Sequence, residues 1–187
     1  MRVLLASQNR NKLRELSSLL PDWEVEPLDA ADYPPESGET YYENARAKAL
    51  FGPDGSWVLG EDSGLEVEAL GGRPGIGSAR YAPEGEQAIA RLLHELREVE
   101  DREARYVSEL VLVAPDGREL RGTGVLPGRI AEEPHGSEGF GYDPVFIPEG
   151  EERTVAELGN EWKEHNSHRA RAARALLGKT GGLLLRD

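Results

Sequence analysis

The sequence predicts an α/β protein with a mixed β-sheet, and three observations support this prediction. Strand-like segments alternate with segments of helical periodicity along the 187 residues, without an internal repeat. A Pro115-Asp116-Gly117 turn between two strongly β segments indicates a hairpin. Other strands run directly into helices, as in βα units. The combination of a hairpin with βα units favours a mixed sheet over a purely parallel, doubly wound one.

The N-terminal elements follow from apolar spacing. Residues 2–6 are expected to form a buried strand, which leads through Ser7-Gln8-Asn9 into a helix that ends before Pro21. The apolar residues with helical spacing in that helix are Leu13, Leu16, Leu19 and Leu20. A short strand over 24–28 and a proline-rich acidic loop over 29–39 come next.

The clearest helix signals lie in the middle of the chain. Thr40, with Glu43 three residues later, gives the capping-box pattern for a helix that ends near Phe51. An amphipathic helix is expected over 84–99, with one apolar face formed by Ile89, Leu92, Leu93 and Leu96. Between these helices, strand-like stretches over 57–60 and 65–70 flank a turn at 61–64, followed by a glycine-rich loop over 71–77.

The C-terminal part is predicted to complete the sheet and add two helices. Its expected elements are strands over 106–114 and 119–125, an irregular loop over 136–144, a brief strand over 145–147, and helices over 154–158 and 167–177. The whole chain, residues 1–187, has the size of one domain.

Composition restricts the function further. The chain has no cysteine, which excludes disulfides, thiolate metal sites and thiol catalysis. The N-terminus is too short for a signal peptide and no apolar run approaches a membrane span, so we expect a cytoplasmic protein without a membrane partner. A net charge of −13 argues against binding long nucleic acid. It does not argue against a small polyanion held by a few cations and a divalent metal.

The loop Ser7-Gln8-Asn9-Arg10-Asn11-Lys12 opens the first helix and is a candidate phosphate site. Unpaired N–H groups at a helix start attract phosphate, and Lys12 adds a positive charge. The alternative is an ordinary helix capped by asparagine. The glycines of a Walker A loop are missing.

Glu36, Glu61 and Asp62 are candidate oxygen ligands for Mg²⁺. Asp62 follows an apolar strand and is expected to project from a sheet end, where it can bind the metal or take a proton from water. Because the chain has 35 acidic residues, a solvated acidic turn remains the alternative for Glu61 and Asp62.

A second group of candidate residues lies nearer the C-terminus. The segment from Gly139 to Pro144 offers aromatic rings that can stack on a base, or else pack in the core of a tight loop. Lys163, His168 and Arg169 can donate to a carbonyl oxygen or a phosphate, whereas the histidine can equally be structural.

Taken together, these motifs resemble the inosine triphosphate pyrophosphatase family, which hydrolyses non-canonical purine nucleoside triphosphates. The resemblance covers nearly the whole chain and keeps the motif order S-Q-N-R-N-K, E-S-G-E-T-Y-Y-E-N-A-R-A-K-A, E-D-S-G-L-E-V-E-A-L-G-G-R-P-G-I-G-S-A-R-Y, G-F-G-Y-D-P-V-F and K-E-H-N-S-H-R-A. It implies a long curved mixed sheet flanked by helices, with two lobes and an active-site cleft between them, usually as a homodimer. It also implies Mg²⁺-dependent hydrolysis of ITP, dITP and XTP to the monophosphate and pyrophosphate.

The resemblance also implies roles for individual residues. Asp62 matches the family's general base, and Glu36 and Asp62 match metal-binding positions. The implied substrate-binding residues are Ser7, Gln8, Asn9, Arg10, Asn11, Lys12, Lys48, Ser63, Phe140, Gly141, Tyr142, Asp143, Lys163, His168 and Arg169. Arg169 is a candidate donor to the 6-oxo group that hypoxanthine and xanthine share. Many members have aspartate where this chain has Glu61, so the contact of Glu61 with the metal is left open.

Two other functions remain as alternatives. One is a nucleotide hydrolase that releases orthophosphate or acts on canonical triphosphates. The other is a non-catalytic module that binds or senses a nucleotide. The first would differ in its products, and the second would bind without turnover.

Overall fold

A computed structural model describes residues 1–30, 32–83 and 85–180. The strands in this part of the chain are β1 (Arg2–Ala6), β2 (Glu24–Pro27), β3 (Val58–Val67), β4 (Glu103–Val113), β5 (Glu119–Ile130) and β6 (Phe146–Pro148). The α-helices are α1 (Arg10–Leu19), α2 (Tyr41–Leu50), α3 (Gly85–Glu95), α4 (Val155–Asn166) and α5 (His168–Thr180). Short 3₁₀ helices cover Glu68–Leu70, Gly75–Arg80 and Asp143–Val145. No helix among the described residues is long and apolar enough to span a membrane.

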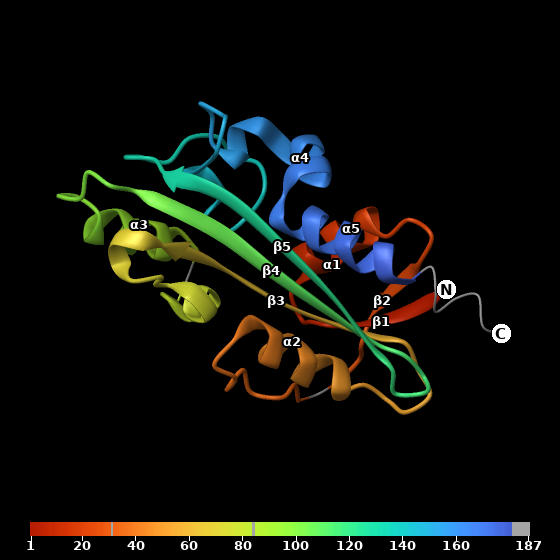
Figure 1. Cartoon of the computed structure of the whole chain (residues 1–187). Coiled ribbons are helices and arrows are strands. Elements are labelled where there is room, and N and C mark those ends of the chain that lie inside the picture. Colours follow the sequence, from red (N-terminus) through yellow and green to blue (C-terminus); the bar gives the residue numbers. More distant parts are fainter. Residues whose placement is uncertain (31, 84, 181–187) are drawn as a thin grey trace. The chain divides into compact units, whose positions relative to one another are not determined.

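The described strands form one mixed sheet in the order β2-β1-β3-β4-β5-β6 (Figure 1). β1 pairs in parallel with β2 and with β3, whereas β6 pairs antiparallel with β5. The connection from β1 to β2 passes through α1, as expected for a βα unit. The predicted mixed sheet with flanking helices is therefore confirmed.

The chain divides into two compact units. Unit 1 comprises residues 1–62, residues 108–124 and the chain from Arg169 onward, and unit 2 comprises residues 63–107 and 125–168. The single domain over 1–187 and the cleft between two lobes stay predictions.

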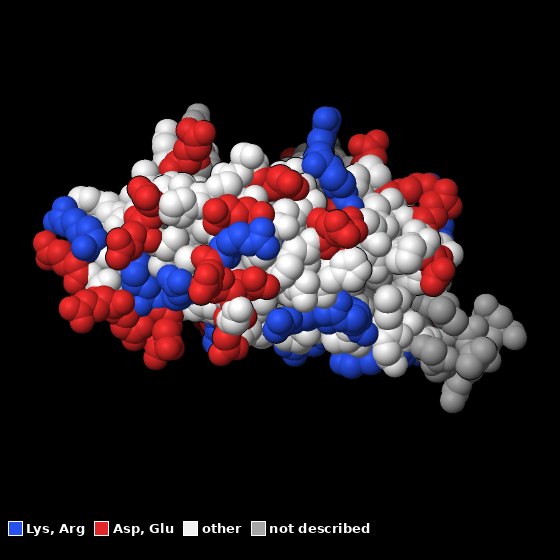
Figure 2. Space-filling model, turned by 90° about the horizontal axis from the view of Figure 1, so that it is seen from above, with Lys and Arg blue, Asp and Glu red and all other residues white. Residues whose placement is uncertain are grey.

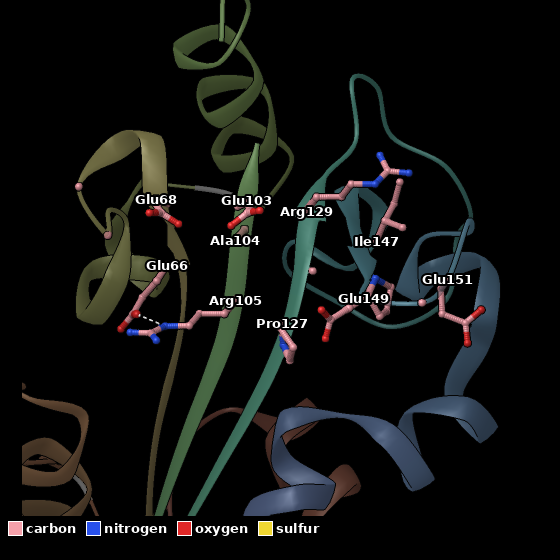
Figure 3. A pocket seen from close by; sticks show the side chains of 15 residues that line it. Glu66, Glu68, Glu103, Ala104, Arg105, Pro127, Arg129, Ile147, Glu149 and Glu151 are labelled. Carbon is pink, nitrogen blue, oxygen red and sulfur yellow. Dashed lines mark hydrogen bonds and ion pairs between the residues drawn. The ribbon is translucent and has the colours of Figure 1, made fainter. Parts of the chain in front are cut away.

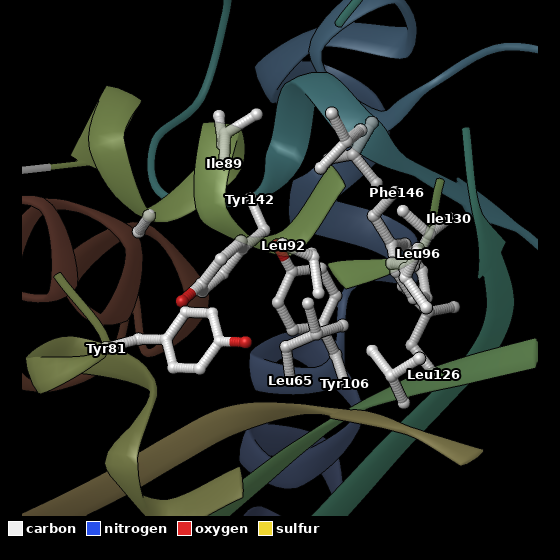
Figure 4. Packing of buried hydrophobic residues seen from close by; sticks show 14 residues of the cluster. Leu65, Tyr81, Ile89, Leu92, Leu96, Tyr106, Leu126, Ile130, Tyr142 and Phe146 are labelled. Carbon is white, nitrogen blue, oxygen red and sulfur yellow. The ribbon is translucent and has the colours of Figure 1, made fainter. Parts of the chain in front are cut away.

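Each unit has its own hydrophobic core. In unit 1, Leu5, Leu59 and Leu110 from three strands are fully buried together with residues of α1 and α5, including Leu16 and Leu176. In unit 2, the aromatic rings of Tyr106, Tyr142 and Phe146 pack with aliphatic side chains of α3, of the residue that follows it and of the sheet, among them Leu65, Leu92, Leu96, Leu126 and Ile130 (Figure 4). These apolar contacts hold the strands that carry the polar residues described below.

Capping explains the two helices next to the candidate site. The Asn9 side chain accepts from the backbone N–H groups of Asn11 and Lys12 and so begins α1. Thr40 and Glu43 form the predicted capping box at the start of α2, with both reciprocal hydrogen bonds present. These local bonds fix where each helix begins, as the sequence predicted.

The predicted turn at residues 61–64 is wrong, because β3 runs without interruption from Val58 to Val67. Asp62 therefore lies within a strand and does not project from a sheet end. The Asp-Ser-Gly sequence is a turn signal by local propensity, but here the ladder continues because Glu61 and Asp62 have buried partners. Tertiary contacts thus override the local preference.

Several element boundaries also differ from the predictions. β5 extends to Ile130 through Pro127, five residues beyond the predicted end at 125. α4 continues to Asn166 across a kink at Gly159, where φ is 87°, so Lys163 lies on α4 and not between the two helices predicted over 154–158 and 167–177. The amphipathic helix ends at Glu95 and not at 99. The predicted start of that helix at residue 84 lies outside the described residues.

Gly60 on β3 permits close packing of the strand against α2. A Cβ atom at this position would overlap the carbonyl oxygen of Ala45 and lie 2.8 Å from the backbone nitrogen of Ala49. Both obstacles are backbone atoms, which cannot rotate away.

We therefore expect Gly60→Ala to lower the free energy of unfolding by about 3 kcal/mol or more, measured by urea denaturation. Gly77→Ala is the control, because a Cβ atom there meets nothing within 4 Å. It should change stability by less than about 1 kcal/mol, and equal losses in both variants would contradict the packing argument.

Candidate active site

Asp62 is the centre of a buried polar group in unit 1. Its side chain is almost fully buried on β3, and its Oδ2 atom accepts a hydrogen bond of 3.0 Å from the Nδ2 atom of Asn44. Its Oδ1 atom lies 3.4 Å from the Nζ atom of Lys48. Asn44 and Lys48 are one turn apart on α2, so one face of that helix supplies both contacts.

Lys48 joins Asp62 to the second predicted metal ligand. Its Nζ atom lies 2.5 Å from Oε1 of Glu36 and donates to the backbone oxygen of Glu61 at 3.1 Å. The carboxylates of Glu36 and Asp62 thus both contact the ammonium group of Lys48. Two carboxylates that converge on a cation suit Mg²⁺, which uses one or two carboxylates with waters and phosphate oxygens. The described residues contain no cluster of three or more Asp, Glu, His or Cys side chains able to hold a metal ion.

The environment shifts the pKa values of this pair. Burial raises the pKa of the Asp62 carboxyl above its ordinary value, and Glu61 adds to the rise, while Lys48 and Asn44 act against it. Burial also disfavours the charged form of Lys48, but Asp62 and Glu36 outweigh burial and raise its pKa, so the ammonium stays protonated. Perturbed carboxylates of this kind are common in catalytic sites, and the role of Asp62 as a general base stays a prediction.

Each carboxylate oxygen of Glu61 contacts a positively charged side chain. Lys12 places its Nζ atom 2.7 Å from Oε2, and Arg169 donates from Nε to Oε1 at 3.0 Å. Glu61 is completely buried. Burial acts to raise its pKa, but these two cations outweigh burial and hold the pKa well below its ordinary value. Glu61 is therefore the counter-ion of Lys12 and Arg169, whereas Glu36 and Asp62 share Lys48, and their binding of a metal stays a prediction.

The loop from Ser7 to Lys12 lies where the parallel strand β1 ends and α1 begins. Such carboxyl ends of parallel strands are common ligand sites in α/β sheets. Gln8, Asn9 and Arg10 are exposed there, and Ser7 accepts a 3.2 Å hydrogen bond from the backbone N–H of Asn9. The asparagine cap and the phosphate site were alternatives at the sequence level; the structure shows the cap and leaves the phosphate role a prediction.

Asp143 organises the predicted base-binding segment in unit 2. It is buried, and its Oδ2 atom accepts from the Nζ atom of Lys163 at 2.7 Å and from the backbone N–H of Phe140 at 2.8 Å. Its Oδ1 atom accepts from the hydroxyl of Tyr106 at 3.3 Å. Asp143 thus fixes the loop and Lys163, which lies 4.5 Å from the centre of the Phe140 ring.

The two aromatic residues of this segment have different surroundings. Tyr142 is buried in the core of unit 2 and donates to the backbone oxygen of Ser78 at 3.1 Å (Figure 4). Burial also raises the pKa of its hydroxyl. Phe140 is half-buried. Of the two rings, that of Phe140 is the more exposed, and its stacking on a base stays a prediction.

His168 and Arg169 are consecutive residues with separate contacts. His168 is buried, and its ring stacks on Tyr106 in unit 2, with centroids 4.5 Å apart and planes at 10°. Arg169 belongs to unit 1, where Nη1 contacts Oε2 of Glu15 at 3.1 Å in addition to Glu61. The proposed contact of Arg169 with a 6-oxo group stays a prediction.

A pocket of about 810 Å³ in unit 2 does not contain these residues (Figure 3). Its charged lining is mainly acidic, with Arg105 and Arg129 beside Glu66, Glu68, Glu103, Glu149 and Glu151. One arginine is already paired, since Arg105 donates to Glu66 at 2.7 Å. Such a lining would repel a triphosphate. The face shown in Figure 2 likewise has acidic side chains interspersed with basic ones over much of its area, and basic side chains gather along its lower edge.

The sequence reasoning missed four residues that bind the predicted ones. They are Asn44, Glu15, Tyr106 and Ser108, the last of which places its hydroxyl 3.4 Å from Oε1 of Glu61. The spacing of Asn44 and Lys48 places them on one helix face, and this signal could have identified Asn44. Tyr106 and Ser108 lie in a strongly apolar strand and gave no comparable signal.

Fold and site define an α/β protein with buried carboxylates paired to lysine and arginine. The model of the Ham1 family matches residues 3–179 of this chain. A dITP/XTP pyrophosphatase of Deinococcus radiodurans is 42% identical over 186 residues, covering 96% of this chain and 93% of the relative. A dITP/XTP pyrophosphatase of Symbiobacterium thermophilum is 45% identical over 191 residues, covering 98% of this chain and 96% of the relative. The structure of the Staphylococcus aureus Ham1 protein aligns with a TM-score of 0.85 at 35% identity, covering 98% of this chain and 100% of that one. The chain belongs to the Ham1 family.

Proposed function

We propose that this chain is a nucleoside triphosphate pyrophosphatase that hydrolyses dITP, ITP and XTP to the monophosphate and pyrophosphate. The observation that carries the proposal is the buried Asp62 carboxylate, held by Asn44 and Lys48 close to Glu36. Two relatives more than 40% identical over nearly the whole chain are named dITP/XTP pyrophosphatases, which supports the substrate class. The role that follows is removal of non-canonical nucleotides from the nucleotide pool.

The proposed reaction is attack of water on the α-phosphorus. Asp62 accepts the proton of the attacking water, and the water oxygen forms the new bond to phosphorus. The bond from the α-phosphorus to the bridging oxygen breaks, and its electron pair leaves with pyrophosphate. Lys48 neutralises charge beside Asp62. The loop from Ser7 to Arg10, in which Gln8, Asn9 and Arg10 are exposed, is proposed to donate to phosphate oxygens.

Mg²⁺ is the proposed cofactor, held by Glu36 and Asp62. When bound, it would neutralise charge on the phosphates as a Lewis acid. For this, Lys48 must share Glu36 and Asp62 with the metal, because the ammonium lies between these two carboxylates. Lys12 keeps Glu61 as its counter-ion in this arrangement.

The residues of unit 2 are proposed to recognise the base. Phe140 is the stacking ring, and Lys163 is a buried cation whose position Asp143 fixes. Gly141 has φ of 64°. Because glycine adopts this conformation readily, the loop can present backbone groups to a ligand. Tyr142, in contrast, has a core-packing role.

A homodimer is proposed from the family resemblance alone, and the cytoplasm is the proposed compartment. The rival from another class is a non-catalytic nucleotide-binding module. The names of two relatives, which are both dITP/XTP pyrophosphatases, argue for catalysis.

Product analysis tests the proposed function. We expect the protein with Mg²⁺ to convert ITP and XTP to monophosphate and pyrophosphate, while GTP and ATP are largely spared. Chromatography of the four parallel reactions identifies the products. Release of diphosphate and orthophosphate would place the attack at the γ-phosphorus, and folded protein without turnover of any substrate would support the binding module.

A further inference from the structure

Asn44 connects β3, the strand that carries Asp62, to the loop that carries Glu36. Its Nδ2 atom donates to Oδ2 of Asp62 at 3.0 Å, and its Oδ1 atom accepts from the backbone N–H of Gly38 at 2.9 Å. Asn44 is 2% exposed, and its bond to Asp62 is buried, whereas its bond to Gly38 is partly buried. A single side chain thus contacts the proposed general base and a loop residue two positions from a proposed metal ligand.

The partners of Asn44 fix the orientation of its amide group. The backbone N–H of Gly38 can only donate, so it must face the amide oxygen. An ionised Asp62 can only accept, so it must face the amide nitrogen. A flipped amide would remove the acceptor of the Gly38 N–H and turn the amide oxygen toward the buried Asp62 carboxylate, so both bonds would be lost. The direction in which Asn44 presents its donor to Asp62 is therefore set by the loop.

The loop itself is held tightly against the start of α2. The carboxylate of Glu43 accepts from the backbone N–H groups of Glu39 and Thr40 at 2.7 and 3.1 Å. A Cβ atom at Gly38 would lie 2.7 Å from Cβ of Glu43 and 2.8 Å from Oδ1 of Asn44, which leaves no space for a side chain. The loop is thus packed on the same helix turn that carries Asn44.

We propose that Asn44 is a positioning residue for the hydrolysis, which orients the Asp62 carboxylate relative to the loop that carries Glu36. The proposal rests on the proposed function, because it assigns Asn44 an effect that is exerted through Asp62. Lys48 contacts the other oxygen of Asp62, so Asn44 and Lys48 together determine how the carboxylate is rotated. Asn44 touches neither the water nor the phosphorus in this account, and its loss should lower kcat more than it changes KM for ITP.

A double-mutant cycle separates positioning from a general loss of structure. We expect Asn44→Ala to lower kcat at least about tenfold in the otherwise unchanged protein, but less than about twofold when Asp62 is already asparagine. KM for ITP should stay within about twofold in the first comparison. The same factor in both backgrounds would show that Asn44 acts independently of Asp62 and would overturn the proposal.

Two further variants keep the test decisive. Asn44→Asp retains an oxygen for the Gly38 N–H but removes the donor to Asp62, and we expect kcat to fall at least about tenfold. Thr40→Ala removes the capping hydroxyl of the same helix without a contact to Asp62, and it should lower the melting temperature while kcat changes less than about twofold. If Asn44→Asp has normal kcat, or if Thr40→Ala loses as much kcat as Asn44→Ala, the proposal is wrong. Absence of pyrophosphate release by the unchanged protein would instead refute the proposed function itself.

Discussion

Replacement of Asp62 by asparagine is expected to lower kcat for ITP at least about a hundredfold, the range for loss of a general acid–base group. Asparagine keeps the size of the side chain but cannot take a proton from water. The neutral side chain also leaves Lys48 with Glu36 as its remaining carboxylate contact. Initial rates of pyrophosphate release at saturating ITP measure the effect.

Binding and folding controls belong with this variant. Calorimetric titration with ITP should still detect binding, because the loop from Ser7 to Lys12 is unchanged. Asp116→Asn, an exposed aspartate in the turn between β4 and β5, should leave kcat unchanged. Near-normal turnover in Asp62→Asn would remove Asp62 from the proposed mechanism.

Glu61→Gln is expected to have the largest effect on stability. The substitution keeps shape but removes the buried negative charge between Lys12 and Arg169, so both cations lose their shared counter-ion. Loss of one partner of a buried ion pair costs about 3–5 kcal/mol in free energy of unfolding. Urea denaturation near neutral pH measures this loss.

Glu66→Gln provides a matched control on the same strand. Glu66 is paired with Arg105, whose side chain is 59% exposed. Solvent screens such a pair, so its loss should cost less than about 1 kcal/mol. Equal destabilisation by the two substitutions would mean that the burial of Glu61 adds nothing.

The stabilisation by Glu61 should also depend on pH. Its pKa in the folded protein is lower than the ordinary 4.5, so folding favours the charged form. The contribution is therefore fully present above this ordinary value and is lost as the pH falls toward the lower folded pKa. The difference in stability between the unchanged protein and Glu61→Gln should shrink when denaturation is repeated at about pH 3.5. A difference that grows at acidic pH would contradict the ion-pair account.

Local signals in the sequence predicted much of the fold. The strand over residues 2–6, the cap at Asn9 and the capping box of Thr40 and Glu43 depend on contacts within a few residues, and the structure contains all three. The continuous β3 strand could not be predicted in this way. Its polar middle is stabilised by Arg169, which is 108 residues from Glu61 in the chain.

The candidate site could be predicted only in part from the sequence, because its contacts also join residues that are far apart in the chain. Lys48, Glu36 and Asp62 were named as candidates, and the structure places them together. The use of Glu61 as a counter-ion, the internal bonds of Asp143 and the core position of Tyr142 depend on partners that the sequence alone does not pair. Residue type and the family resemblance identified these candidates, but long-range contacts decide what each one binds.

Hydrolysis of ITP in ¹⁸O-enriched water tests the central claim most directly, because the label reports which phosphorus the water attacks. After a single turnover, the monophosphate and pyrophosphate are separated, and the mass of each is measured by mass spectrometry. The account predicts that one ¹⁸O atom enters the inosine monophosphate and that the pyrophosphate carries none. Label in the pyrophosphate would place the attack on the β-phosphorus and contradict the role proposed for Asp62.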